Sequence, residues 1–582
     1  MNARSWRAVR AALALAAVAV LTSACLGVPT GGQVVSVGSG TTSSGATGIA
    51  IDPRPPRKGM GPNEIVDGFL EALLATPLQT STAGQFLTAD AQKGWKPDDQ
   101  VLVYSGKASA VASGDDVSVQ LGPTWRIDGR GVWQGAVATT ERRLTFTMTK
   151  EDGQWRIAEV PNALIVPDWW FEGRYSQMSL YYFNASETQL VPEPVFVPRG
   201  NELATVLVRD LLLGPGKELE GLIHSVVPAD VSQGLSVPID ANGVASIELS
   251  GNGDDQVRSA DATNKLIAQL AWTLRQDSDI SRMQLSIGGQ PVSLSNGRTE
   301  FDVSSAGPQF DPAGYQSSPL LFGVKDRKVV AGTLPQLSST RGPLGQSRHD
   351  LRSIGVDLSG TRIAAVTGSG QEVLLTATTK QDEPVTTVLR GGRDLLKPVW
   401  DGEGRLWLVD RRRTGARISV VADAQTRQVT LPGISGADVR RLLVSRDGTR
   451  VLAVVRNGMV DRVVVSRIST SSDGVIGAVG EARVVSSDLG EIDDMVWASP
   501  TSVTVLHRLD DSARVTTLPV DGAGVALMPG GTLVGQVLSG LIGSPASGQP
   551  TYGVDGRDLI SLSTVGRDET IAPGVTALTY VG

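Results

Sequence analysis

The chain of 582 residues contains very little cysteine, histidine and lysine. Cys25 is the only cysteine, which excludes a disulfide within the chain. The three histidines, His224, His349 and His507, lie in separate segments without a second metal ligand at helix or turn spacing. We therefore expect no metal site and no cofactor, and stability that comes from packing alone.

Catalytic signatures are also absent from the sequence. It has no G-x-S-x-G elbow, no P-loop, no H-E-x-x-H motif and no completed dinucleotide-binding pattern. The formal charge of −7 argues against a nucleic-acid partner. We expect a protein that is not an enzyme and has no catalytic residues, with a wall-processing enzyme kept as the least favoured hypothesis.

The first 24 residues have the charge pattern of a secretory signal. Arg4, Arg7 and Arg10 precede an apolar run over 11–21, and the cationic end of such a segment stays cytoplasmic. A transmembrane helix needs about 20 apolar residues, so this run is too short to span the bilayer. We predict a signal peptide over 1–24 that is cleaved.

Small residues precede Cys25 in a way that resembles a lipobox, although Thr22 stands where leucine is usual. The resemblance implies that Cys25 carries diacylglycerol and palmitate chains and anchors the protein in the lipid bilayer of the cell membrane. The alternative is an ordinary cleavage site with an accidental cysteine. Residues 25–58 are rich in glycine, serine and threonine, which predicts a lipidated, flexible tether.

Residues 59–170 favour an N-terminal α+β domain. Pro62 suits the first turn of a helix, and the apolar positions from Ile65 to Leu74 recur at helical spacing. A second short helix is expected over 83–91. Alternating apolar residues over 101–160, with a turn before Gln154, predict an antiparallel sheet.

Four aromatic residues, Trp169, Trp170, Phe171 and Tyr175, stand between this domain and the next. Because aromatic side chains bury well, we interpret them first as a packed joint between the two domains. The alternative is a docking patch for a partner.

Residues 171–300 read as strand, helix, strand, helix, strand, a compact α/β sandwich. The helices are expected over 202–213, ending at Gly214-Pro215, and over 257–274. The segments Leu180-Tyr-Tyr-Phe183, Leu211-Leu-Leu-Gly-Pro215 and Ser225-Val-Val-Pro228 resemble the GerMN domain of Gram-positive surface lipoproteins. The resemblance implies a binding or assembly module without enzymatic activity.

Residues 301–582 contain many short apolar runs and little helical periodicity. Three runs align with a turn before each strand, and their glycines Gly360, Gly402 and Gly448 lie 42 and 46 residues apart. A period of about 40–45 residues is typical of propeller blades. We predict an all-β propeller with six blades, or seven if some are short.

Two kinds of charged segment are candidate binding sites. The acidic runs Asp254-Asp255 and Glu491-Ile-Asp-Asp494 lack the regular oxygen spacing of a calcium loop, so solvated loops are the favoured interpretation. Arg411-Arg-Arg413 is interpreted as a solvated blade turn, with contact to anionic lipid headgroups or wall polymer as the alternative.

The order of lipobox, GerMN-like domain and propeller resembles the LpqB family of actinobacterial lipoproteins over essentially the whole chain. The segments Gly59-Met-Gly-Pro-Asn-Glu-Ile-Val-Asp-Gly-Phe-Leu70, Gln85-Phe-Leu-Thr-Ala89 and Gln154-Trp-Arg-Ile157 carry this resemblance, together with Trp95. The excess of arginine over lysine fits a GC-rich actinobacterial genome.

The resemblance implies a non-catalytic accessory of a two-component sensor histidine kinase. Such a protein would lie on the extracytoplasmic face of the membrane, contact the extracytoplasmic domain of the kinase, and influence signalling in cell-wall homeostasis and division. The alternative function is a receptor that binds glycan or peptide in the propeller channel, where loops gather around a central space.

Overall fold

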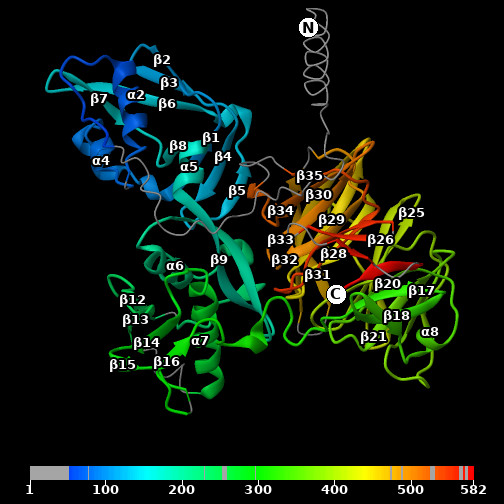
Figure 1. Ribbon diagram of the computed structural model, residues 1–582. Helices are drawn as coiled ribbons and strands as arrows, with labels where there is room; N and C mark the ends of the chain where they lie inside the picture. The colour runs from blue at the N-terminus through cyan, green and yellow to red at the C-terminus, as the bar shows by residue number, and fades with distance from the viewer. Residues whose placement is uncertain are drawn as a thin grey trace, which may run out of the picture.

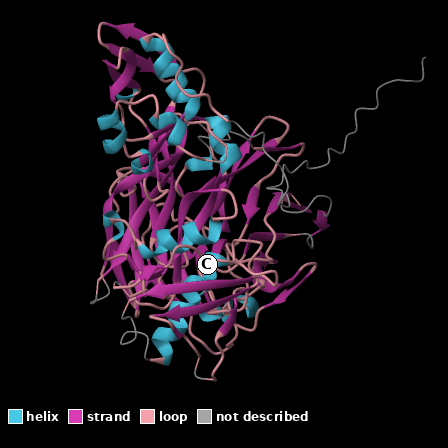
Figure 2. Cartoon of the chain, turned by 90° about the vertical axis from the view of Figure 1, so that its left-hand side faces the viewer, coloured by secondary structure: helices cyan, strands magenta, loops and turns pink. Residues whose placement is uncertain are grey.

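The computed structural model describes residues 52–582, except 77, 229, 252–258, 295, 472–474, 487–488, 525–530, 557, 563–567 and 571–573. These residues form three units that follow one another along the chain (Figure 1). The first two units lie one below the other, and the third lies beside them. Strands are far more abundant than helices (Figure 2).

Helix α2 (Pro62–Ala72) opens the first unit and matches the predicted helix. Pro62 occupies its first turn, and the Glu64 carboxylate accepts a hydrogen bond from the Gly61 N–H at 2.7 Å. The side chains of Ile65 and Phe69 are buried against the sheets. The amphipathic pattern read from the sequence therefore corresponds to a helix that covers the core of this domain.

The single short helix expected over 83–91 is wrong. The structure has two short helices instead, α3 (Ser81–Gly84) and α4 (Ala89–Gly94). Between them the backbone pairs with the sheet, because Thr88 N–H donates to Ile157 O at 2.9 Å and Ile157 N–H donates to Phe86 O at 3.0 Å. The Thr88 hydroxyl then caps α4 by accepting from Ala91 N–H at 3.2 Å.

Two four-stranded sheets complete the first unit, in the orders β5-β4-β1-β8 and β2-β3-β6-β7. The strand pairs within 101–160 are antiparallel, as predicted, and the parallel strand β8, which pairs with β1, lies beyond that range. The predicted hairpin is β6–β7, whose turn places Asp152 and Gly153 at positive φ. The strands are β1 (Gln100–Tyr104), β2 (Ser109–Ser113), β3 (Asp116–Gln120), β4 (Thr124–Asp128), β5 (Trp133–Ala136), β6 (Arg143–Glu151), β7 (Gln154–Glu159) and β8 (Leu164–Pro167), with helix α5 (Asp168–Arg174) following.

The second unit has two helices and two small sheets, as the α/β interpretation requires. Helices α6 (Leu203–Leu212) and α7 (Ala260–Leu274) pack against each other and share one apolar core with both sheets. The sheet orders are β10-β9-β11 and β12-β13-β14-β15, with β16 paired to β14. The strands are β9 (Tyr175–Asn184), β10 (Leu190–Pro198), β11 (Ile223–His224), β12 (Ser232–Gln233), β13 (Val244–Ser250), β14 (Arg282–Ile287), β15 (Gln290–Pro291) and β16 (Glu300–Asp302).

The third unit is a propeller of four-stranded antiparallel sheets, and its described residues form six of them. The last strand, β40, joins the sheet of β17, β18 and β19, so the C-terminal end closes the sheet that begins the propeller. The strands of this sheet and the next two are β17 (Leu321–Lys325), β18 (Lys328–Thr333), β19 (Gln336–Ser339), β40 (Val575–Thr579), β20 (Leu351–Val356), β21 (Arg362–Thr367), β22 (Val373–Ala377), β23 (Thr386–Leu389), β24 (Val399–Trp400), β25 (Leu406–Arg412), β26 (Gly415–Ala422) and β27 (Gln425–Val429); a short helix, α8 (Pro343–Gln346), precedes β20.

The innermost strands of these sheets are β40, β20, β24, β28, β32 and β36, and consecutive members contact one another from β40 to β36. They surround the axis of the propeller. The strands of the remaining sheets are β28 (Asp438–Val444), β29 (Arg450–Asn457), β30 (Val460–Thr470), β31 (Ile476–Ser486), β32 (Asp494–Ser499), β33 (Ser502–Arg508), β34 (Ala513–Pro519), β35 (Thr532–Val534), β36 (Gly540–Ile542), β37 (Tyr552–Asp555), β38 (Asp558–Ser561) and β39 (Asp568–Thr570).

The repeated turns join each innermost strand to the second strand of its sheet. The predicted alignment of Gly402 with Gly360 and Gly448 is wrong. The equivalent residue is Gly404, because Gly360, Gly404 and Gly448 have φ of +75°, +74° and +74°. Each donates its N–H to the carbonyl three residues earlier, at 2.9, 3.1 and 3.0 Å. The spacing is therefore 44 residues in both cases (404 − 360 and 448 − 404), since each turn requires a residue at positive φ.

Candidate binding site where the three domains meet

Cys25, the expected lipidation site, lies outside the described residues. In the part of the chain that the structure does describe, no helix is both long and apolar enough to cross a bilayer.

Three of the four aromatic residues at the domain boundary are buried. Phe171 and Tyr175 stack with ring centroids 4.5 Å apart, and the Phe171 ring lies 5.2 Å from that of Phe196 on β10. Together with buried Trp170, they join the first domain to the β9–β10 hairpin of the second. Only Trp169, which is 60% exposed, can face a partner. A docking patch made of all four residues therefore does not agree with the structure.

The tip of the β9–β10 hairpin lies against the turns of the propeller. Asn184 Nδ2 donates to Asp447 O at 3.4 Å, and Gln189 Nε2 donates to Asp311 O at 2.8 Å. Both amide side chains are buried. Because a buried amide needs partners for its polar atoms, these contacts specify how the GerMN-like domain sits on the propeller.

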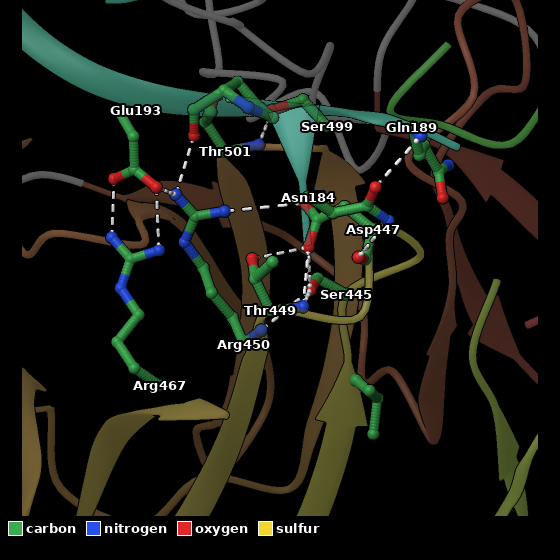
Figure 3. A network of polar contacts seen from close by, with 12 residues as sticks. Asn184, Gln189, Glu193, Ser445, Asp447, Thr449, Arg450, Arg467, Ser499 and Thr501 are labelled. Carbon is green, nitrogen blue, oxygen red and sulfur yellow. Dashed lines mark hydrogen bonds and ion pairs between the residues drawn. The ribbon is translucent and has the colours of Figure 1, made fainter. Parts of the chain in front are cut away.

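Glu193 on β10 forms the strongest link between these two domains (Figure 3). Its Oε1 accepts hydrogen bonds from Arg450 Nη2 at 2.8 Å and Arg467 Nη1 at 2.8 Å, and its Oε2 accepts one from Arg467 Nη2 at 2.5 Å. Arg450 Nη2 also donates to Pro192 O at 2.7 Å. Glu193 is 6% exposed and Arg450 is 0% exposed, so this charge cluster is buried.

The electrostatic balance at Glu193 favours the ionised form. Burial alone raises the pKa of the Glu193 carboxyl, but the charges of Arg450 and Arg467 and their hydrogen bonds outweigh burial and hold this pKa below its ordinary value of 4.5. Charge-assisted hydrogen bonds of this kind are stronger than neutral ones. The cluster therefore fixes β10 to strands β29 and β30 of the propeller.

A cavity of about 500 Å³ opens beside this cluster, and all three domains line it. The first domain contributes Trp133, the second contributes Tyr182 and Leu219, and the propeller contributes Val465 and Val520. Apolar side chains thus form much of its wall. A cavity at a domain junction with apolar walls and a few charged groups has the usual make-up of a ligand or peptide site.

Arg130 of the first domain lies at the edge of this cavity. Its Nη1 donates to Gly214 O at 2.6 Å and to Leu213 O at 3.2 Å, directly after the C-terminal end of α6. The last carbonyls of a helix carry a partial negative charge. This contact therefore attaches the first domain to the second at the same place where the cavity is formed.

The charged groups that line the cavity are of both signs. Burial raises the pKa of Asp521, against opposing hydrogen bonds and the charge of Arg483, and burial likewise raises the pKa of Asp210. Asp521 Oδ2 accepts from Gln177 Nε2 at 2.8 Å, a further contact between the propeller and the second domain. Glu481 lies exposed on the propeller side. Groups of both signs beside apolar walls suit a peptide segment better than a purely anionic or cationic ligand.

Arg446 closes the propeller channel at the end that faces the second domain. From the turn after β28 it donates to Val581 O at 2.7 Å, just after β40, and to Ser544 Oγ at 3.2 Å, just after β36. It also donates to Ala313 O in the linker that enters the propeller. The guanidinium is fully enclosed, and this burial lowers the pKa of Arg446 to about 10.

Two of the three histidines and one of the two acidic segments make contacts within the fold. His224 contacts Glu187 at 2.9 Å, and Nδ1 of buried His507 lies 3.3 Å from Glu491 O. Asp494 pairs with Arg441 at 2.8 Å, while Asp254 and Asp255 lie outside the described residues. Over the residues that can be described, no three potential metal ligands come together.

The arginine run occupies the turn between β25 and β26 and the end of β25. Arg411 pairs with Asp394, Arg412 pairs with Asp410 at 2.6 Å, and Arg413 is exposed. Ion pairs within the propeller thus partly neutralise the charges of Arg411 and Arg412. Arg413 is exposed and forms no ion pair with the described residues.

Three family models match successive parts of the chain. "Lipoprotein LpqB, N-terminal domain" matches residues 55–172, "Sporulation and spore germination" matches 179–293, and "Lipoprotein LpqB beta-propeller domain" matches 328–570. Lipoprotein LpqB of Thermobifida fusca is 28% identical and covers 96% of both chains; that of Cutibacterium acnes is 26% identical and covers 91% of this chain and 92% of its own. The first GerMN domain of GerM from Bacillus subtilis is 20% identical, with a TM-score of 0.18, over 22% of this chain and 97% of its own.

The fold and the junction define a multidomain protein in which a GerMN domain is held between an N-terminal α+β domain and a C-terminal β-propeller. The models that match its two ends are both models of one lipoprotein family, and the relatives align along nearly the whole chain. The chain belongs to the LpqB lipoprotein family.

The residues that hold the domains together were missed in the sequence. A signal was present, because Glu193 is the one ionisable residue in the otherwise apolar strand Leu190–Pro198. A lone carboxylate in a buried strand requires a cationic partner. Its partners Arg450 and Arg467 are more than 250 residues away in sequence, so no local pattern identifies them.

Proposed function

We propose that this lipoprotein is a membrane-anchored, non-catalytic accessory of a two-component sensor histidine kinase. Acylated Cys25 would hold it at the extracytoplasmic face of the cell membrane, where it would contact the extracytoplasmic domain of the kinase. Through this contact it would modulate signalling in cell-wall homeostasis and division. Its membership in a lipoprotein family supports the anchor.

The observation that carries the proposal is the cavity that the three domains share. Buried charge pairs and amide contacts join the domains around it, so a partner that enters it touches three domains at once. Its apolar walls and charges of both signs suit a protruding peptide segment of a partner protein. A contact of this kind transmits a binding event without any chemical step.

Site-specific photo-crosslinking in intact cells tests this proposal. A photo-reactive amino acid is placed at Glu218 or Glu481, which are both exposed and line the cavity from different domains. The matched control is Lys380, which is exposed on the propeller away from the cavity. We expect both cavity positions, and not Lys380, to capture a membrane kinase. Capture of no kinase from either cavity position contradicts the proposal.

A second candidate function is a receptor that binds glycan or peptide in the propeller channel. The ring of innermost strands favours it, because the loops at the ends of such a ring gather around a central space. A thermal-shift screen of the full chain with soluble peptidoglycan fragments tests this function. We expect a raised unfolding midpoint with at least one fragment, and no shift with any fragment contradicts it.

A further inference from the structure

Lys397 lies near the axis of the propeller, immediately before the innermost strand β24. Its Nζ donates to Thr579 Oγ1 at 2.7 Å. Thr579 is on β40, which is separated from β24 by one innermost strand, β20, around the ring. The charge of Asp494 on β32, two strands away in the other direction, also acts on it. Because β20 lies between β24 and β40, a side chain that contacts Thr579 from a position just before β24 must project into the central channel.

The Lys397 side chain is exposed to solvent although innermost strands surround it. A side chain that is exposed and also lies among the innermost strands must lie in a channel that is open to solvent. Lys397 precedes the N-terminal end of β24. The turn at the C-terminal end of β24 lies on the same propeller face as the turn after β28, which contains Arg446. The channel around Lys397 is therefore reached from the propeller face opposite the GerMN domain.

The charge around Lys397 is not balanced. Asp494 is the carboxylate that acts on it, but Asp494 Oδ1 accepts from Arg441 Nε at 2.8 Å and its Oδ2 accepts from Leu541 N–H at 2.9 Å. Among the described residues Lys397 itself forms no ion pair, and one hydroxyl is its hydrogen-bond acceptor. An ammonium group has three N–H donors. The group of Lys397, Arg441 and Asp494 thus carries one positive charge in excess.

The surroundings disfavour this excess charge. Burial among the innermost strands lowers the pKa of Lys397, and the charge of Asp494 only partly opposes this effect. An anion in the channel would provide the missing counter-charge and accept the remaining hydrogen bonds.

We propose that the propeller channel contains a binding site for the anionic oxygen group of a small ligand, a carboxylate or a phosphate, with the Lys397 ammonium as its principal contact and the Thr579 hydroxyl positioning that ammonium. The site is entered from the face opposite the GerMN domain. This inference rests on the second candidate function, the channel receptor, and is independent of the kinase contact.

Titration of the full chain with two simple probes tests the site. Sodium acetate and inorganic phosphate are added separately at fixed ionic strength, and the apparent Kd is obtained from the shift of the thermal unfolding midpoint. We expect Lys397→Gln to raise the apparent Kd for the bound probe at least tenfold, and Lys397→Arg to keep it within about threefold. Lys380→Gln, an exposed lysine changed in the same way, should leave it unchanged.

Lys397→Met shows whether the lysine is merely structural. Because Lys397 forms no ion pair among the described residues, its removal leaves no partner without a counter-charge, and we expect this variant to fold with a midpoint at or above that of the wild type. A preference for acetate indicates a carboxylate ligand, and a preference for phosphate indicates a phosphate ligand. Either result supports the site if Lys397→Gln weakens binding of that probe at least tenfold. No stabilisation by either probe overturns the site.

The channel receptor and the anion site can fail separately. If peptidoglycan fragments stabilise the wild type and Lys397→Gln equally, the receptor function stands and the anion site is overturned. An equal loss of probe binding in Lys380→Gln also overturns it, because binding would then depend on general surface charge.

Discussion

Replacing Glu193 by glutamine removes the charge at the centre of the link between the GerMN domain and the propeller. The substitution keeps the size of the side chain and one oxygen acceptor. It leaves the guanidinium group of Arg467, which lies 2.5 Å from the carboxylate, without its ion-pair partner, and it leaves Arg450, which lies 2.8 Å from the carboxylate, with only Asp447 Oδ2 at 3.5 Å as a counter-charge. Arg450 is completely buried, so solvent cannot take over the role of the carboxylate.

The expected cost is about 3–5 kcal/mol of unfolding free energy, the usual range when one partner of a buried ion pair is removed. Arg467 is 26% exposed in its side chain, which places the expected loss toward the lower end of that range. Replacing Glu193 by leucine together with Arg450→Met and Arg467→Met should recover part of the loss, because both guanidinium charges are removed with the carboxylate, while Asp447 loses its ion pair with Arg450.

Equilibrium unfolding in guanidinium chloride measures this effect, with hydrogen exchange of β10 and β29 as a separate readout of domain docking. The control is Glu248→Gln on the exposed side of β13, which should change stability by less than about 0.5 kcal/mol. A Glu193→Gln protein as stable as the wild type, with unchanged exchange in β10, would refute the reasoning.

The same link predicts a pH dependence. The pKa of Glu193 is lower in the folded protein than its ordinary value of 4.5. Its contribution to stability is therefore fully present above about pH 4.5 and is lost as the pH falls through the folded-state pKa. Glu193→Gln should show a smaller loss of stability than the wild type over this acidic range.

The remaining predictions concern the domain boundary, a propeller turn and the anchor. Trp170→Ala should lower stability by about 3–5 kcal/mol because its ring is buried, whereas Trp169→Ala should change it by less than about 0.5 kcal/mol; equal losses in thermal unfolding would contradict this contrast. Asp401→Ala should cost about 3 kcal/mol, since its buried carboxylate accepts hydrogen bonds from Arg405 Nε at 2.6 Å and Trp407 Nε1 at 2.9 Å; an unchanged unfolding midpoint would count against it. Cys25→Ser should move the protein from the membrane to the soluble fraction, and retention at the membrane would show that Cys25 is not the anchor.

Local patterns predicted the elements of the fold well where one face of an element is buried. Helix α2, helix α6 and the β6–β7 hairpin follow directly from apolar spacing and turn residues, because these signals act between neighbours in the chain. The helix over 83–91 failed because backbone pairing with β7, far away in sequence, interrupts it. The same limit explains why the sequence did not predict the parallel pair of β1 and β8.

The repeat in the propeller shows a finer limit. The period was visible in the sequence, but two glycines stand in the turn at 402 and 404. Only the backbone geometry identifies Gly404 as the residue at positive φ and Gly402 as the one packed beneath Arg446 O and Gln189. A count of letters cannot make this choice, because both positions carry the same residue.

The sequence by itself determined the order of the three domains and the type of most elements, and it predicts an anchor at Cys25, since all of these depend on residues close together in the chain. Only the tertiary structure decided which charges meet. Glu193 pairs with Arg450 and Arg467 across more than 250 residues, and Lys397 reaches Thr579 across 182. The physical reason is that a buried or enclosed charge must find its partner in space, and the fold brings distant segments together without leaving a local trace in the sequence.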